Sequence, residues 1–129
     1  MLENILKIEL GGKTMNNKEL SMVFADLLSE KKAVDIKVID IAEKSSFADF
    51  FVNASAGSAR HLDSLARDVE DKFAELGIET KSIDGKPESG WILIDGGDVI
   101  VNIFTIETRD KYTLDKFWSD CETIVIENR

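Results

Sequence analysis

Apolar and polar residues alternate along this chain with two different periods, which predict helices and strands in turn. Apolar positions spaced three and four residues apart predict amphipathic helices at 18–31 and 58–77. An asparagine can cap the first helix, and the second begins at a serine and ends at a glycine, as helix ends favour. Segments 34–41, 49–54 and 78–83 are rich in β-branched or aromatic residues and predict strands.

The clearest local signal lies between Trp91 and Phe104, where two apolar runs flank the four residues Asp-Gly-Gly-Asp. A Gly-Gly pair tolerates the positive φ angles of a type I′ turn, so we expect a β-hairpin with a two-residue turn at Gly96 and Gly97. In that register Asp95 faces Asp98, Leu93 faces Ile100 and Trp91 faces Asn102. One face of the hairpin is then purely aliphatic and belongs to the core: Ile92, Ile94, Val99, Val101 and Ile103.

The other face of the hairpin has two interpretations. It carries Trp91, Leu93, Ile100 and Phe104. Either a helix covers this face, as helices cover both faces of many α/β sheets, or the face is a binding surface, since tryptophan is enriched at binding hot spots. The two aspartates at the tip are likewise either turn residues bonded to local backbone N–H groups or an acidic tip presented to a basic partner.

These elements, with helical signals again at 107–118, predict an α/β fold: a mixed five-stranded sheet flanked by helices. We expect residues 15–120 to form this domain and residues 1–14 to be an N-terminal extension outside it. Residues 121–129 are a C-terminal tail, which forms either a final helical turn or an extra edge strand because its middle is β-prone.

Composition narrows the classes of function. The chain has 129 residues, of which 43% are hydrophobic and 32% charged, as expected for one ordered domain. Its net charge of −9 repels phosphate backbones, which argues against direct nucleic-acid binding and favours a basic protein partner or simply solubility. Cys121 is the only cysteine, so one chain holds no disulfide, and the thiol fits a reducing cytoplasm. No apolar run approaches the roughly 20 residues that cross a membrane.

Three motifs suggest chemistry, and their context argues against each. Gly-Lys-Thr at 12–14 resembles the end of a phosphate-binding loop, but Lys7 stands where that loop needs its first glycine. Asp68 and Glu70 follow a Gly-Ser pair as the metal-binding carboxylates of nucleotidyltransferases do, but on a helix they point about 200° apart. His61, the only histidine, has no recognisable nucleophile for a catalytic triad and is expected to be a solvated helix-start residue.

The hairpin and the residues after it carry a resemblance to a known family. Residues 91–104, followed by Arg109, Tyr112, Leu114, Lys116 and Trp118, resemble the signature of the Iojap family, the ribosomal silencing factors. Residues 48–52 and 54–55, followed by Ser58, Arg60 and His61, match the family's other recurrent segment in order and spacing. The resemblance covers about Lys18 to Asp120.

This resemblance implies a nucleotidyltransferase-like fold that lacks the transferase chemistry, with no cofactor or metal. It also implies binding to ribosomal protein L14 of the large ribosomal subunit, on the face that the small subunit must meet. The expected result is a steric block of subunit joining that represses translation under nutrient limitation. Family members tend to be cytoplasmic homodimers, and their tryptophan at the start of the hairpin corresponds to Trp91.

The expected partner-binding residues are Trp91, Leu93, Asp95, Asp98, Ile100, Asn102, Phe104, Arg109 and Tyr112. The chain departs from the family pattern at Asn102, where histidine is usual, and at Gly96, where tyrosine or leucine is usual. Two alternatives to a silencing factor are a nucleotidyltransferase-like enzyme, which would need carboxylates converging on one pocket, and a dimeric adaptor without a ribosomal role.

Overall fold

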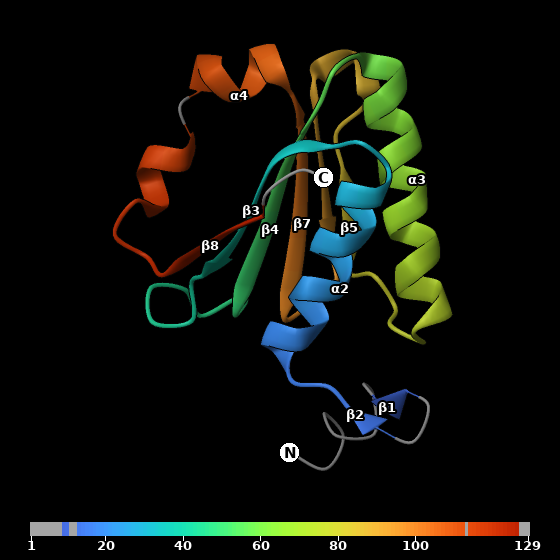
Figure 1. Ribbon diagram of the computed structural model, residues 1–129, viewed down its shortest axis with the longest axis vertical. Helices are drawn as coiled ribbons and strands as arrows, with labels where there is room; N and C mark the ends of the chain where they lie inside the picture. Colours follow the sequence, from blue (N-terminus) through green and yellow to red (C-terminus); the bar gives the residue numbers. More distant parts are fainter. Residues whose placement is uncertain (1–8, 11–12, 113, 127–129) are drawn as a thin grey trace.

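The computed structural model describes residues 9–10, 13–112 and 114–126 (Figure 1). Its centre is a six-stranded mixed sheet in the order β5-β6-β7-β4-β3-β8, in which only β4 and β7 pair in parallel. The strands are β3 (Val34–Asp40), β4 (Phe50–Ala56), β5 (Ser82–Asp84), β6 (Trp91–Asp95), β7 (Val99–Thr105) and β8 (Thr123–Ile126). A separate two-stranded sheet, β1 (Glu9–Leu10) and β2 (Lys13–Thr14), precedes them.

The expectation of five strands is wrong, because the C-terminal tail adds a sixth. β8 pairs antiparallel with β3, and its Ile124 and Ile126 pack against the core. Burying these two side chains gives the tail a reason to extend along the sheet rather than to coil. The predicted third strand is shorter than expected and begins later, at Ser82, because Ile78 turns inward to the core before pairing starts.

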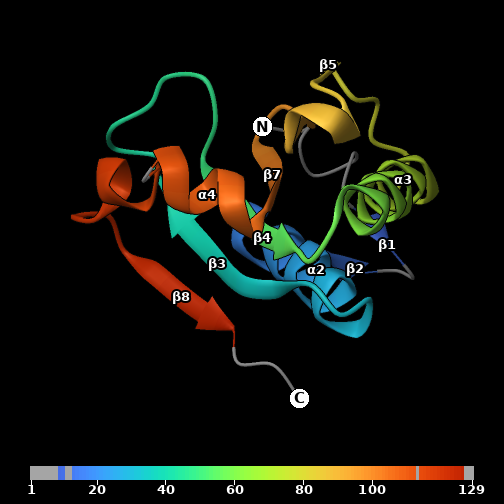
Figure 2. The ribbon, with the colours of Figure 1, turned by 90° about the horizontal axis from the view of Figure 1, so that it is seen from above.

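Two long helices, α2 (Asn17–Glu30) and α3 (Ala59–Glu75), cover one face of the sheet (Figures 1 and 2). Both begin as the sequence predicts. Asn16 and Glu19 form a reciprocal capping box at α2, Ser58 caps α3 by accepting from the His61 N–H, and Gly77 follows α3 at φ 75°. None of the helices that the structure describes is long and apolar enough to cross a membrane.

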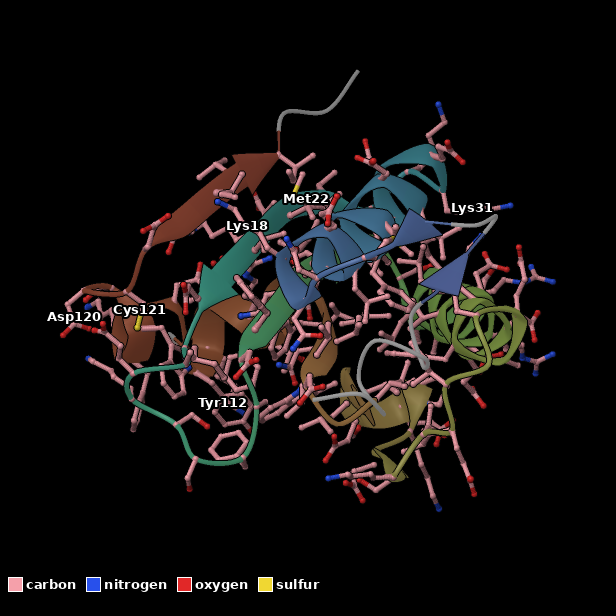
Figure 3. The ribbon with its side chains drawn as sticks, turned by 90° about the horizontal axis from the view of Figure 1, so that it is seen from below. Lys18, Met22, Lys31, Tyr112, Asp120 and Cys121 are labelled. Carbon is pink, nitrogen blue, oxygen red and sulfur yellow. The ribbon has the colours of Figure 1, made fainter. Side chains whose placement is uncertain are left out.

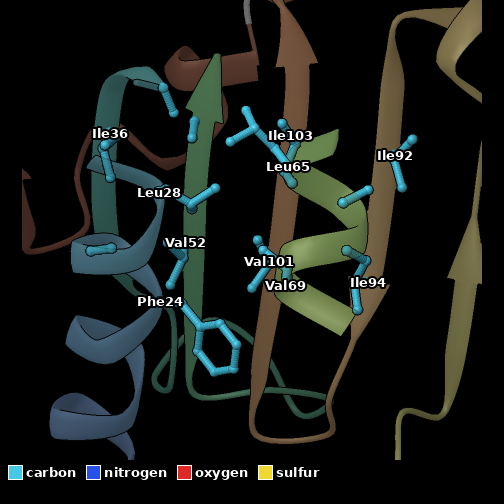
Figure 4. Close-up of a cluster of buried hydrophobic side chains, with 14 of the residues drawn as sticks. Phe24, Leu28, Ile36, Val52, Leu65, Val69, Ile92, Ile94, Val101 and Ile103 are labelled. Atoms are coloured by element: carbon cyan, nitrogen blue, oxygen red, sulfur yellow. The ribbon is translucent and has the colours of Figure 1, made fainter. Parts of the chain in front are cut away.

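The main core lies between these helices and the sheet (Figure 4). The aliphatic face of the hairpin is buried there as predicted, beneath the ring pair Phe24 and Phe73, whose centroids are 4.2 Å apart. The opposite face carries a smaller cluster that ends at Trp118 and the half-buried Cys121, which Figure 3 shows at the edge of the molecule away from α3.

The register of the β6–β7 hairpin differs from the predicted one by two residues. Asp95 lies opposite Ile100, and the Gly96 N–H donates to the Val99 carbonyl, so the connection spans residues 96–99. Of the two glycines only Gly97 has a positive φ angle, whereas a type I′ turn needs two. Because side chains alternate with a period of two, the shift leaves every residue on its predicted face.

Candidate functional site

The second face of the hairpin is partly covered and partly open. The short helix α4 (Ile106–Tyr112) and the 3₁₀ turn η2 (Leu114–Trp118) pack on it, opposite α2 and α3 (Figure 2). Ile100, Asn102 and Phe104 are buried on this face, the last only 1% exposed. Ile100 and Phe104 therefore fit the interpretation in which this face is covered, and partner binding by these three residues stays a prediction.

The open part of this face is an apolar groove. Trp91 and Leu93 of β6 are half-buried and line it, together with Asp84 and Gly85 at the end of β5, Ser89 and Tyr112. We call this the Trp91 groove. Its volume is about 490 Å³, and Tyr112 at its edge is 54% exposed. Three of the nine predicted partner-binding residues thus meet in one accessible depression.

The indole of Trp91 is fixed from several sides. Its ring centroid lies 5.2 Å from that of Phe104 and 6.5 Å from that of Tyr112. Its Nε1–H donates to Asn102 Oδ1 at 3.1 Å. Asn102 Nδ2 in turn donates to Asn53 Oδ1 at 3.1 Å, from the neighbouring strand β4. Asn102 therefore lies behind the groove rather than in its wall.

Arg109 is also buried, at 6% exposure, and it anchors α4 to the sheet. Its Nη1 donates to the Asp35 carbonyl at 2.5 Å and to Ser55 Oγ at 3.0 Å. Its Nε donates to Asp115 at 3.3 Å, and its guanidinium lies 5.9 Å from the centre of the Phe104 ring. Because α4 ends at Tyr112, this anchor also positions the edge of the groove.

Asp115 forms ion pairs with two cationic side chains. Lys37 donates to it at 3.1 Å, and Arg109 holds its other oxygen. Burial raises the pKa of Asp115, but the charge of Arg109 and the hydrogen bond and charge of Lys37 outweigh that effect and hold the pKa below its ordinary value. The carboxylate therefore stays ionised and joins η2 to β3 and α4.

The two aspartates at the hairpin tip do not face each other, contrary to expectation. Asp95 Oδ1 accepts the Gly97 N–H at 2.8 Å, which is the local turn role. The exposed Asp98 accepts at its backbone carbonyl from the N–H groups of Asp49 and Phe50. Its carboxylate lies outside the Trp91 groove, so the tip and the groove are separate features.

The sequence motifs weighed for catalysis lie elsewhere. Asp68 and Glu70 are in α3, as predicted. His61 was expected to be a solvated helix-start residue, but its ring also makes two contacts. Its Nδ1 accepts from the Gly57 N–H at 3.3 Å, and its Nε2 lies 2.9 Å from the Lys31 carbonyl, which joins α3 to the end of α2. Of the Gly-Lys-Thr motif, Gly12 lies outside the described residues.

A second hollow, of about 520 Å³, lies where β4 and β7 end, the place where α/β enzymes commonly bind substrates. Its lining includes hydroxyl groups and two carboxylates, Glu88 and Glu107, but neither Asp68 nor Glu70. The carboxylates that a nucleotidyltransferase-like enzyme would use therefore do not converge on it.

Sequence analysis missed four residues that support the site: Asp35, Asn53, Ser55 and Asp115. One signal for two of them was present, since Asn53 and Ser55 alternate with apolar residues in an otherwise buried strand. Polar side chains at such positions need buried partners. The partners themselves come from strands and helices distant in sequence.

The fold and the groove define a small α/β protein with a tryptophan-lined apolar depression at its surface. The sequence profile of the family described as "Ribosomal silencing factor during starvation" matches residues 14–129. This chain belongs to that family, whose members are regulatory proteins.

Individual relatives agree with this assignment. The chain is 35% identical over 106 residues to the ribosomal silencing factor RsfS of Bacillus subtilis, covering 82% of this chain and 90% of that protein. It is 33% identical to the chloroplastic protein Iojap of Zea mays, covering 78% of this chain and 43% of that one. A crystal structure from Chromobacterium violaceum superposes with a TM-score of 0.77 at 28% identity, covering 81% of this chain and 88% of that one.

Proposed function

We propose that this protein silences ribosomes by docking the Trp91 groove on ribosomal protein L14 of the large subunit, which sterically blocks joining of the small subunit under nutrient limitation. It acts in the cytoplasm without catalysis or cofactor, on a nucleotidyltransferase-like fold, and forms a homodimer. The observation that carries the proposal is a half-buried tryptophan and an exposed tyrosine around one apolar groove.

Physical chemistry supports this choice of surface. A rigid tryptophan presented in a depression is typical of a binding anchor, because it buries a large area with little loss of conformational freedom. The net charge of −9 attracts a basic partner over distance, whereas the groove supplies short-range contact. Asp84 in the groove wall adds local negative charge.

The test is co-sedimentation of the purified protein with isolated large and small ribosomal subunits, followed by titration of large subunits and of isolated L14. Trp91→Ala should weaken large-subunit binding by about 30- to 1,000-fold, the equivalent of about 2–4 kcal/mol. Light scattering of mixed subunits should show that the wild type, but not this variant, prevents joining.

The matched control is Phe117→Ala. Phe117 is a 75% exposed aromatic residue on η2 that does not line the groove, so its loss should leave binding unchanged. Circular dichroism melts accompany both variants, because Trp91 also packs on Phe104. A Trp91→Ala protein that melts normally and binds large subunits as the wild type does would sink the proposed surface.

A further inference from the structure

Two linked hydrogen bonds, the first partly buried and the second buried, run from Trp91 in the groove into the sheet. Asn102 and Asn53 lie side by side on the parallel strands β7 and β4, and both are buried. Their neighbours along each strand, Val101, Ile103, Val52 and Ala54, belong to the main apolar core. Buried amides cost free energy unless they are hydrogen-bonded, and here each amide is bonded toward the other or toward Trp91.

The Trp91 ring packs near Phe104 and Tyr112. The torsion that rotates an indole about its Cβ–Cγ bond has a broad, roughly two-fold profile, which gives two ring orientations related by half a turn. The indole N–H is the only polar atom that distinguishes these two orientations. Its bond to Asn102 Oδ1 selects one of them.

We propose that Asn102, held by Asn53, is a positioning residue that presets the indole of Trp91 in the orientation required for docking. The inference rests on the proposed function, since it assigns a role within the same groove. A preset anchor binds more tightly because less conformational freedom is lost on association. Asn53 acts one step further back, since it holds the Asn102 amide with its oxygen toward Trp91.

The two hydrogen bonds of Asn102 define which side chains can replace it. The position needs an acceptor toward Trp91 and a donor toward Asn53. A neutral histidine offers one nitrogen of each kind, whereas leucine offers neither at a similar size. The pair Asn102→His and Asn102→Leu therefore separates the hydrogen-bonding requirement from the requirement for bulk.

The experiment is a double-mutant cycle on the full-length chain, with large-subunit affinity measured by titration. Asn102→Leu should weaken binding by about three- to tenfold, the usual worth of one hydrogen bond. In the Trp91→Phe background, which keeps a ring but has no N–H, the same change should have no further effect. Asn102→His, measured at pH 8, should keep affinity within about twofold of the wild type.

A merely structural Asn102 gives a different pattern. Its loss would then weaken binding equally in both backgrounds, and that result, or an unchanged affinity for Asn102→Leu, overturns the proposal. If Asn102→Leu does not fold, the double variant Asn53→Leu/Asn102→Leu replaces it, because removing both amides leaves neither unpaired. The expected cycle is the same for that variant.

The experiments distinguish a failure of the positioning role of Asn102 from a failure of the proposed function. If Trp91→Ala binds as the wild type does, the groove is not the docking surface. If Trp91→Ala loses binding but Asn102 shows no coupling to Trp91, only the positioning role is wrong. Fluorescence anisotropy of Trp91, recorded in a Trp118→Phe background so that only Trp91 emits, should fall when Asn102 is leucine and recover when it is histidine.

Discussion

Replacing Arg109 with methionine tests whether the anchor of α4 holds the groove together. The change keeps an apolar stem against Phe104 but removes the donors to the Asp35 carbonyl, to Ser55 and to Asp115. Breaking a buried ion pair by removing one partner typically costs about 3–5 kcal/mol. The free energy of unfolding of this protein should fall by less than the upper end of that range, for two reasons.

Both reasons come from the surroundings of the guanidinium. The Asp115 side chain is 37% exposed and also bonded to Lys37, so water and lysine can satisfy it once Arg109 is gone. Arg109 Nη2 is buried with no hydrogen-bond partner among the described residues, and the change relieves the cost of burying it. We therefore expect a loss of about 2–4 kcal/mol, or roughly 6–16 °C in melting temperature for a domain of this size.

Urea denaturation followed by circular dichroism measures this loss, and hydrogen exchange locates it. Exchange should accelerate in α4 and η2 more than in β6 and β7, because the central strands are held by their own pairing and by the main core. Arg109→Lys should recover only part of the stability, since an ammonium lacks the planar set of donors. An Arg109→Met protein whose unfolding free energy lies within about 1 kcal/mol of the wild type would refute this account.

Three further predictions concern acid stability, chemistry and the hairpin tip. The pKa of Asp115 is lower in the folded protein than its unfolded value near 3.8, so the ionised carboxylate stabilises the fold above that value and loses the effect as pH falls through the folded pKa. The difference in unfolding free energy between the wild type and Asp115→Asn should therefore be constant from pH 5 to 7 and shrink below about pH 4. The double change Asp68→Asn/Glu70→Gln should leave subunit binding unaltered, and nucleotide transfer by the wild type that this change abolishes would contradict a non-enzymatic role. Gly96→Ala should cost about 1–3 kcal/mol in urea melts, because an added Cβ would lie 2.3 Å from the Phe73 ring, and much less in a Phe73→Leu background.

Local chemistry explains why the helices and the core face could be predicted from the sequence. The capping residues Asn16 and Ser58 act within one helical turn of their own position, and the aliphatic alternation of β6 and β7 depends only on the period of a strand. These signals do not depend on what the rest of the chain does. The same holds for the position of Asp68 and Glu70 within a helix.

Features that depend on distant segments could not be predicted in the same way. The addition of β8 to the sheet depends on its contact with β3, whose Ile36 lies ninety positions before its partner Ile126. The burial of Ile100 and Phe104 depends on where α4 and η2 fold back, and Arg109 fixes that through the carbonyl of Asp35 and the hydroxyl of Ser55. No sequence pattern near Arg109 indicates that Asp35 and Ser55 are its partners.

The hairpin shows how a wrong register can still give a correct contact. The predicted two-residue turn placed Trp91 directly opposite Asn102, whereas the observed loop of residues 96–99 places Trp91 opposite Phe104. Asn102 is then the diagonal neighbour, two positions along on the same face, and a large side chain reaches such a neighbour. The indole accordingly stacks near the directly opposed Phe104 and bonds to the diagonal Asn102. The longer loop thus places the apolar support directly opposite Trp91 and the polar anchor diagonal to it, and the predicted register would have exchanged these two positions.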